Sequence, residues 1–440
     1  MDGTGQLSER SRARMRAAEQ QLRSLELFGM RFGLDRMRRM MTALGSPERR
    51  FQCVHLLGTN GKSSTTRMAA AILEAHGLRT GAYLSPHLVS YGERVLIAGR
   101  EMGDSEFAEA IERAVRAAER VNRTLAEGDH VTQFELLTAA ALWHMAEREV
   151  QVAVVEAGLG GRYDATSVVQ ALVTVLTNVG LEHTRWLGPT VRHIAEEKLA
   201  VVRDGATLVL GEELAPDALA VARRVAQERG ARVVRATPLQ PELALRARGA
   251  FQRRNFALAR AAARAALREC GIELSEPAVR EAAARVEVPG RLQLLAEHPL
   301  TIIDGAHNPH AVAALLASLP ELLAGRPLAL VLGVLEDKDA AAMLAQLLPR
   351  TERAWFTAPP GARALSPAAL ESLARQQGFE RSSCEPVPAR ALQAAREWAG
   401  EHGGAVLATG SVYLIGDLLA ARAGASRGPQ AATLSRGSLP

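Results

Sequence analysis

The sequence predicts an α/β protein with two domains, each built on a mostly parallel β-sheet. In two parts of the chain, short runs rich in Val, Leu and Ile alternate with longer stretches rich in Ala, Leu and Arg. The short runs contain few polar residues, which is typical of strands covered by helices on both faces of a parallel sheet. A length of 440 residues also suits two domains.

The first domain is predicted from strands and a helix that precede residue 288. The helix spans 63–76 and is closed by Gly77, a residue type that often follows a helix C-terminus. We expect the strands of its sheet at residues 51–57, 82–85, 152–157, 171–179 and 206–211.

The same alternation begins again after residue 295 and predicts a second, smaller domain. Its strands are expected at residues 300–304, 328–335, 353–358 and 405–410, with helices at 309–323 and 367–378. The breaker pair Pro289-Gly290 lies between the two parts. We therefore expect domains at 1–288 and 289–423. Residues 424–440 are rich in Gly, Ser and Pro, and we expect a disordered tail there.

Composition excludes several classes of protein. The formal net charge is only +5 and no dense basic run interleaves with aromatic residues, so no nucleic-acid partner is expected. The start of the chain lacks the apolar core of a signal peptide, and no run of 18 apolar residues predicts a membrane span. Three distant cysteines predict neither a zinc site nor a disulfide framework. We expect a cytoplasmic protein that acts on small molecules as a monomer.

The stretch GTNGKSS at residues 58–64 follows the first predicted strand and opens the first helix. Gly58 and Gly61 would let backbone N–H groups approach a phosphate, and Lys62 would reach its terminal oxygens. A hydroxyl after the lysine would bind Mg²⁺, and both Ser63 and Ser64 are candidates. The pattern lacks the usual first glycine, since Leu56 stands there. The alternative is an ordinary strand–turn–helix with a surface lysine.

Two further strand ends carry polar residues. Glu156 ends an apolar strand and is followed by GLGG, while Glu182 and His183 follow the next strand. Ligands of open α/β sheets gather at the carboxyl ends of the strands, and a carboxylate there suits Mg²⁺. The alternatives are a surface ion pair for Glu156 and a structural role for His183. Lys198, on a helix, is by default a solvated charge.

The second domain repeats this arrangement. Asp304, His307 and Asn308 follow a predicted strand. Asn308 before Pro309 is typical of a helix N-terminus, so we expect Asn308 to cap the helix while Asp304 and His307 face a cleft. In the first domain, Thr132 with Glu135 forms a capping-box pattern, which indicates a structural role for Glu135.

The motifs that carry a family resemblance follow in order along the chain: FGMRFGLDRMRRMMTALGSPE, HLLGTNGKSSTT, YLSPHLVSYGERVLI, TQFELLTAAAL, VEAGLGGRYDAT, GLEHTRWLGPTVRHIAEEKLAV, FQRRNFALA, VPGRLQLL, IIDGAHNPHAV, GVLEDKD and ATGSVYLIGDL. Over about residues 25–420 the chain resembles the folylpolyglutamate synthase/dihydrofolate synthase family, which is related to the Mur ligases. The resemblance implies a P-loop-type ATPase domain followed by a smaller Rossmann-like glutamate-ligase domain. It also implies an ATP-dependent acid–amino-acid ligase that adds L-glutamate to dihydropteroate, to folates, or to both, through an acyl phosphate.

The resemblance also assigns roles to residues. It implies catalytic roles for Lys62, Lys198 and His183, with Lys198 carbamylated. The implied ATP site comprises Gly58, Thr59, Asn60, Gly61, Lys62, Ser63, Ser64, Asn255, Arg291, Asp304 and His307. The implied substrate site comprises Ser85, Pro86, His87 and Arg94, and the implied Mg²⁺ ligands are Ser64, Glu156, His183 and carbamylated Lys198. Ser64 is preferred to Ser63 because Ser63 stands where the family usually has Gly.

The chain departs from the family pattern at several positions, and rival readings exist. Glu182 replaces the usual Asp, and Gln133 stands where an aromatic residue is common, which affects the expected folate pocket. A peptidoglycan Mur ligase would need a further domain before Gly58, and only 57 residues precede it. Another Mur-type ligase acting on a different carboxylate remains the alternative function, and a non-catalytic phosphate-binding module is a third reading.

Overall fold

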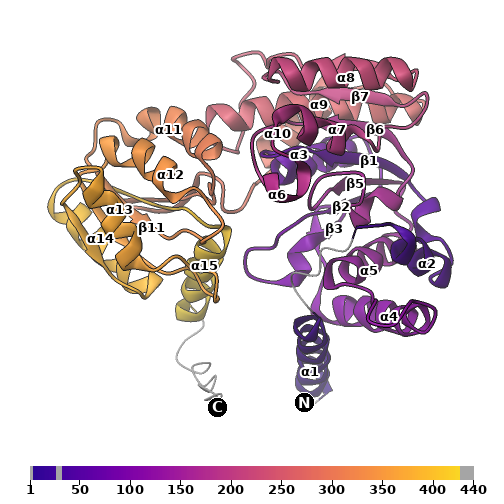
Figure 1. The fold of residues 1–440 in the computed structure, drawn as a ribbon, viewed down its shortest axis with the longest axis horizontal. Coiled ribbons are helices and arrows are strands. Elements are labelled where there is room, and N and C mark those ends of the chain that lie inside the picture. Colours follow the sequence, from indigo (N-terminus) through magenta and orange to yellow (C-terminus); the bar gives the residue numbers. More distant parts are fainter. Residues whose placement is uncertain (1–2, 26–31, 427–440) are drawn as a thin grey trace. The chain divides into compact units, whose positions relative to one another are not determined.

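The computed structural model describes residues 3–25 and 32–426, which form two compact units (Figure 1). The first unit comprises Met1–Arg246 and Gln252–Glu287, and the second comprises Ala247–Phe251 and Val288–Pro440. The short segment 247–251 thus packs with the second unit, although it precedes most of α9 (Ala250–Glu269).

The first unit is built on an eight-stranded sheet in the order β4-β3-β2-β5-β1-β6-β7-β8. The strands are β1 (Gln52–Leu57), β2 (Thr80–Tyr83), β3 (Val95–Ile97), β4 (Arg100–Glu101), β5 (Val152–Glu156), β6 (Ala171–Leu176), β7 (Thr207–Leu210) and β8 (Arg232–Arg235). The strands from β2 to β8 in that order run parallel, and only β3 and β4 are antiparallel to their neighbours. In register, Leu56 pairs with Glu156 and Leu57 with Leu176, so β1, β5 and β6 end at one edge of the sheet.

Helices pack around this sheet (Figure 1). Those of the first unit are α1 (Gly3–Ser24), α2 (Asp35–Ala43), α3 (Lys62–Ala75), α4 (Asp104–Asn122), α5 (Gln133–Glu147), α6 (Thr184–Leu187), α7 (Val191–Leu199), α8 (Pro216–Glu228), α9 and α10 (Glu276–Arg285). One apolar cluster joins α1, α2, α4 and α5 to the strands and includes Leu22, Met37 and Ile111. A second cluster joins α7 and α8 to β6 and β7 through residues such as Ile194 and Val221. The sheet edge that carries the loops is therefore held between two cores.

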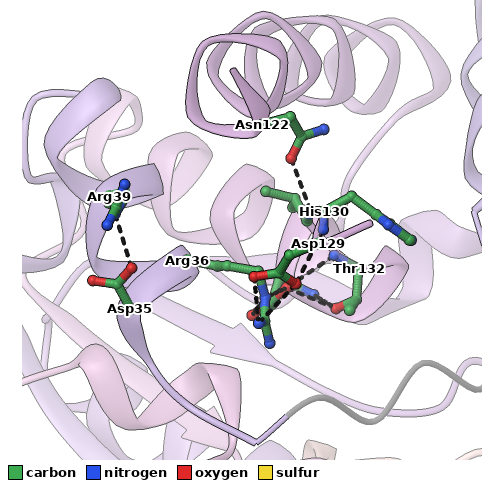
Figure 2. A network of polar contacts seen from close by, with 9 residues as sticks. Asp35, Arg36, Arg39, Asn122, Asp129, His130 and Thr132 are labelled. Carbon is green, nitrogen blue, oxygen red and sulfur yellow. Dashed lines mark hydrogen bonds and ion pairs between the residues drawn. The ribbon is translucent and has the colours of Figure 1, made fainter. Parts of the chain in front are cut away.

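A buried ion pair joins α2 to the start of α5. Arg36 Nε lies 3.1 Å from Glu135 Oε1, and both side chains are less than a tenth exposed. Arg36 Nη1 also lies 3.2 Å from Asp129 Oδ1 (Figure 2). Glu135 accepts the Thr132 N–H as well, which completes the capping box predicted from the sequence. Glu135 therefore has a structural role.

The second unit has a six-stranded sheet in the order β13-β12-β11-β14-β10-β9. Its strands are β9 (Gln293–Glu297), β10 (Leu300–Ile303), β11 (Leu328–Leu332), β12 (Arg353–Phe356), β13 (Ser382–Cys384) and β14 (Ala405–Thr409). Its helices are α11 (Pro309–Leu323), α12 (Ala340–Leu347), α13 (Pro367–Gln376), α14 (Pro388–Glu401) and α15 (Val412–Ser426). Only β9 is antiparallel, and the Asn308 side chain caps α11 as predicted.

The α/β class and the two parallel-dominated sheets predicted from the sequence are confirmed. The prediction missed β3 and the edge strands β4, β8, β9 and β13. β4, β8 and β13 are short and partly or largely exposed, so they lack the continuous apolar runs that identified the central strands. β3 is apolar but only three residues long. Helix α15 includes residues 424–426, the start of the stretch expected to be disordered, and 427–440 lie outside the described residues. In the described part of the chain, no helix is long and apolar enough to cross a membrane.

Candidate active site

The loop between β1 and α3 requires both of its glycines. Gly58 has φ +148°, and a Cβ placed on it would lie 1.8 Å from Thr177 Oγ1. Gly61 has φ +83°, and its Cβ would lie 2.5 Å from Asn255 Oδ1. Side chains are excluded by both backbone conformation and space. The loop therefore packs directly against Thr177 and Asn255, so Asn255, a residue predicted for the ATP site, lies beside Gly61.

The segment after β6 holds this loop from the other side. Asn60 N donates to Asn178 Oδ1 at 2.9 Å, and Thr177 Oγ1 donates to the Asn60 carbonyl at 2.6 Å. Thr59 Oγ1 accepts the Gly180 N–H at 3.0 Å. The sequence reading missed Thr177 and Asn178, although both stand at the end of a predicted strand.

Two lysines converge on one backbone carbonyl of the loop. Lys62 Nζ lies 3.0 Å from Gly58 O, and Lys198 Nζ lies 2.9 Å from the same atom. Lys198 is only 4 % exposed, so the default reading of a solvated helix charge is wrong. Burial lowers the pKa of Lys198 to about 7, and the nearby Lys62 charge acts in the same direction. The buried amine is therefore easily deprotonated near neutral pH.

Glu156, the last residue of β5, is buried beside the start of α3. Its Oε1 accepts the Ser63 hydroxyl at 2.9 Å, and its Oε2 accepts the Ser85 N–H at 3.2 Å. The alternative of a surface ion pair does not describe this buried carboxylate. Of the two candidate serines, Ser63 contacts Glu156, whereas Ser64 is buried within α3.

His183 occupies a strained position in the loop after β6. It has φ +52° and precedes α6, and its Nε2 lies 3.6 Å from Glu182 Oε1. Left-handed backbone in a residue with a large side chain is uncommon and often marks a functional loop. Among the described residues, no group of three or more His, Cys, Asp or Glu side chains is arranged to hold a metal.

The GLGG turn is fixed by Asp164, which the sequence reading did not single out. The Asp164 carboxylate accepts the Leu159 N–H at 2.7 Å and the Thr166 hydroxyl at 2.5 Å. Thr166 Oγ1 in turn lies 2.8 Å from His55 Nε2 on β1. Burial raises the pKa of Asp164. These buried contacts link the turn after β5 to the strand that leads into the phosphate loop.

The predicted substrate residues lie in one loop between β2 and β3. Arg94 Nε donates to His87 Nδ1 at 2.9 Å, so these two residues are brought together. The Ser85 backbone N–H donates to Glu156. Pro86, between Ser85 and His87, is exposed.

A group of exposed aromatic residues lies beside the site loops, and no periodic pattern in the sequence indicates it. Phe32 contacts Tyr163 and Trp186 with ring centroids 5.5 and 5.9 Å apart. Tyr163 follows the GLGG turn and Trp186 follows His183. Exposed aromatic rings in contact are typical of binding surfaces.

The remaining predicted nucleotide residues lie in the second unit: Arg291 lies just before β9, and Asp304 and His307 follow β10. Asp304 is buried, and its carboxylate accepts the Leu292 and Ala306 N–H groups, each at 2.8 Å. Burial raises the pKa of Asp304, while Arg291 opposes that shift. Asp304 thus holds two loops together. His307 Nδ1 lies 2.9 Å from Gly305 O.

Comparison with known proteins agrees with the fold and the loops. Residues 57–235 match the Mur ligase middle domain, and residues 290–412 match the Mur ligase glutamate ligase domain. The dihydrofolate synthase/folylpolyglutamate synthase of Escherichia coli (strain K12) is 37% identical over 339 residues, which cover 74% of this chain and 77% of that protein. The chain belongs to the folylpolyglutamate synthase/dihydrofolate synthase family.

Other members of the family extend the match. The folylpolyglutamate synthase of Lacticaseibacillus casei is 32% identical over 404 residues, covering 86% of this chain and 92% of that protein. The Mycobacterium tuberculosis folylpolyglutamate synthase complexed with ADP superposes with a TM-score of 0.88 at 31% identity, covering 96% of this chain and 100% of the other. Membership of this family makes the chain an ATP-dependent ligase that joins an acid to an amino acid.

Proposed function

We propose that this chain uses ATP to join L-glutamate to the carboxylate of dihydropteroate, of a folate, or of both. The observation that carries the proposal is the convergence of Lys62, Lys198 and Glu156 around one glycine loop in a member of this family. The E. coli relative named FolC has been solved in complex with DHPP and ADP, and another neighbour as an FPGS–AMPPCP–folate complex. These ligands support a pterin-type acid and ATP as the substrates.

The reaction has two steps. A carboxylate oxygen of the acid attacks the γ-phosphorus of ATP, which releases ADP and leaves an acyl phosphate. The glutamate nitrogen then attacks the acyl carbon, and the tetrahedral intermediate expels phosphate to form the amide. We assign the phosphates to the backbone N–H groups of residues 58–64 and to Lys62, because a loop at a helix N-terminus stabilises negative charge there.

The donor atoms beside the loop suit Mg²⁺. A buried carboxylate and a hydroxyl are the hard oxygen ligands that this ion prefers, and Glu156 with Ser63 supplies them. We therefore propose Ser63 in place of Ser64 as the hydroxyl ligand, with His183 joining when substrates are bound. Bound Mg²⁺ would neutralise charge on the transferred phosphoryl group.

Lys198 is proposed to act as a carbamate. Only a neutral amine adds to CO₂, and the lowered pKa favours that form. The product is an anion that can serve as a further metal ligand, whereas an ammonium group cannot.

The acid substrate is assigned to the loop that contains Ser85, Pro86, His87 and Arg94. Arg94 supplies a positive charge in this loop, held by its bond to His87, and Phe32, Tyr163 and Trp186 offer flat apolar surfaces for an aromatic substrate. In the second unit we assign Arg291 and His307 to the nucleotide. Asp304 is assigned an indirect role, because backbone N–H groups already occupy its carboxylate.

A substrate panel tests the function. Purified protein is incubated with ATP and labelled L-glutamate, and with dihydropteroate, tetrahydrofolate or neither acid. We expect ADP release and label incorporation only when glutamate and one of the acids are both present. The acid that supports turnover distinguishes addition of the first glutamate from chain extension. ADP release at the same rate without glutamate would overturn the ligase assignment.

A further inference from the structure

The charge and the proton position of His87 are fixed by its neighbours. Arg94 Nε lies 2.9 Å from His87 Nδ1, and a guanidinium nitrogen can only donate. The atom that receives this bond must therefore be an unprotonated ring nitrogen. In a neutral imidazole the proton then resides on Nε2. A ring rotated by 180° would place a carbon at this position and would lose the bond.

The surroundings oppose a second proton on the ring. A protonated His87 would direct an Nδ1–H toward the Arg94 guanidinium, so two donors and two positive charges would meet. Burial, followed by the Arg94 charge, lowers the pKa of His87 to about 3. Tyr91 covers one side of the pair, with its ring centroid 4.3 Å from that of His87 and 5.6 Å from the Arg94 guanidinium carbon. Phe107 stacks on Tyr91 at 5.7 Å and anchors it to α4.

Glu93 fixes the backbone that carries His87. Its carboxylate accepts three consecutive N–H groups, from Leu88 at 2.8 Å and from Val89 and Ser90 at 2.7 Å each. These residues begin directly after His87, and Glu93 directly precedes Arg94. One carboxylate thus closes the loop whose two ends carry the His87–Arg94 pair. A charged acceptor with three donors is a strong local constraint.

The Nε2–H of His87 is left for a ligand. In the described residues the only hydrogen bond of this imidazole is the one to Arg94, and the side chain is half-buried. We propose that His87 is a permanently neutral hydrogen-bond donor, with its Nε2–H directed to an acceptor oxygen or ring nitrogen of the acid substrate, and that Glu93 is its positioning residue. The binding part of this proposal rests on the proposed function, whereas the proton position does not. The ring consequently cannot serve as an acid or a base in the reaction.

Nitrogen NMR of the full chain labelled with ¹⁵N-histidine tests the proton position. The chain has 11 histidines, and the His87→Gln variant assigns the His87 signals by their loss. We expect the pattern of a neutral Nε2–H imidazole, unchanged from pH 5.5 to 8.5. An imidazolium pattern that appears near pH 6.5, or a neutral Nδ1–H pattern, would overturn the proposal. This measurement needs no substrate, so it stands whether or not the chain is active.

Binding measurements test whether His87 Nε2–H donates a hydrogen bond to the acid substrate. The His87→Phe variant keeps a ring but loses the donor, whereas His87→Gln keeps a side-chain N–H near the Nε2 position. We expect the Kd for the acid that supports turnover to rise about tenfold in His87→Phe, because one hydrogen bond is lost. The rise should be smaller in His87→Gln. The Kd for ADP should not change. Equal weakening by both variants, or an unchanged Kd in His87→Phe, would contradict the donor role.

Glu93→Gln tests the positioning role, because its amide nitrogen cannot accept an N–H group. We expect the KM for the acid to rise, the KM for ATP to stay constant, and the His87 nitrogen signals to shift. Glu93→Asp should restore part of the affinity. Unchanged His87 signals in Glu93→Gln would remove Glu93 from the proposal. If the wild-type protein binds neither pteroate nor folate, the proposed function fails while the proton position is still decided by NMR.

Discussion

The Ser63 hydroxyl donates a 2.9 Å hydrogen bond to Glu156 Oε1, which joins the first turn of α3 to the end of β5. Glu156 also holds the backbone of Ser85. One buried carboxylate therefore contacts both the phosphate loop and the proposed substrate loop.

Replacing Ser63 should weaken Mg²⁺ use. In Ser63→Ala the carboxylate loses its hydroxyl neighbour, and we expect the Mg²⁺ concentration for half-maximal activity to rise about tenfold. Mn²⁺ binding in the presence of ADP, followed by electron paramagnetic resonance, should weaken in parallel. Ser64→Ala is the matched control and should leave both values close to those of the wild type. The opposite ranking of the two variants would restore Ser64 as the metal ligand.

Lys62→Ala should abolish turnover and leave the fold intact. The side chain is half-buried and bonds only to loop carbonyls in the described structure, so its loss leaves no buried charge unpaired. We expect glutamate-dependent ADP release to fall at least about 100-fold, since a charge that stabilises the transferred phosphoryl group is lost. Circular dichroism and Tm should match the wild type. Full activity in this variant would exclude the loop from the mechanism.

Lys198 should carry a carbamate whose amount depends on pH. With a pKa of about 7, the amine is mainly neutral at pH 8 and mainly charged at pH 6. Protein equilibrated with ¹³CO₂ should therefore show a ¹³C carbamate signal that is stronger at pH 8 than at pH 6.

The chain contains only three lysines, Lys62, Lys198 and Lys338, which makes the signal easy to assign. Lys198→Arg should remove it, and Lys338→Arg should retain it. A carbamate that survives in Lys198→Arg would assign the modification to another amine.

Gly61 and Gly77 form a matched pair, because both have φ +83°. Gly77→Ala should cost about 1–2 kcal/mol of unfolding free energy from backbone strain alone, since nothing lies within 4 Å of the added Cβ. Gly61→Ala adds a collision with Asn255 Oδ1, so it should cost more and also weaken ADP binding. Denaturant unfolding and calorimetric binding of ADP measure both effects. Equal losses in the two variants would show that the packing of Asn255 is dispensable.

The Arg36–Glu135 pair should contribute far more to stability than an exposed pair. Arg36→Met removes the cation at the start of α2 that contacts both Glu135 and Asp129, and we expect a loss of about 3–5 kcal/mol of unfolding free energy. Arg50→Met breaks an exposed pair with Glu147 and should cost under about 1 kcal/mol. Urea unfolding of both variants checks the ranking. Similar losses would show that burial does not govern this pair.

The central strands and the loops at their ends were readable from the sequence, because strands buried on both faces are continuous apolar runs. Glu156 and His183 could be placed at a sheet edge for the same reason. The edge strands could not be predicted from the sequence. β4 and β8, for example, are held mainly by backbone hydrogen bonds to a neighbour and expose most of their side chains. From its helix position alone Lys198 would be a solvated charge, because a helix position does not reveal what the helix packs against. The family resemblance implied a role for Lys198 at the site instead, and the structure shows that the side chain is buried.

By itself, the sequence determined the fold class, the family and the residue types at the site. The tertiary structure decided which atoms meet. Ser63, not Ser64, contacts Glu156, and Lys198 donates to the carbonyl of Gly58. The bond from Arg94 determines which ring nitrogen of His87 carries the proton. The physical reason is that burial and hydrogen-bond direction depend on neighbours distant in the chain. Local patterns specify a helix or a strand, but the charge and the proton position of a side chain are set by what surrounds it.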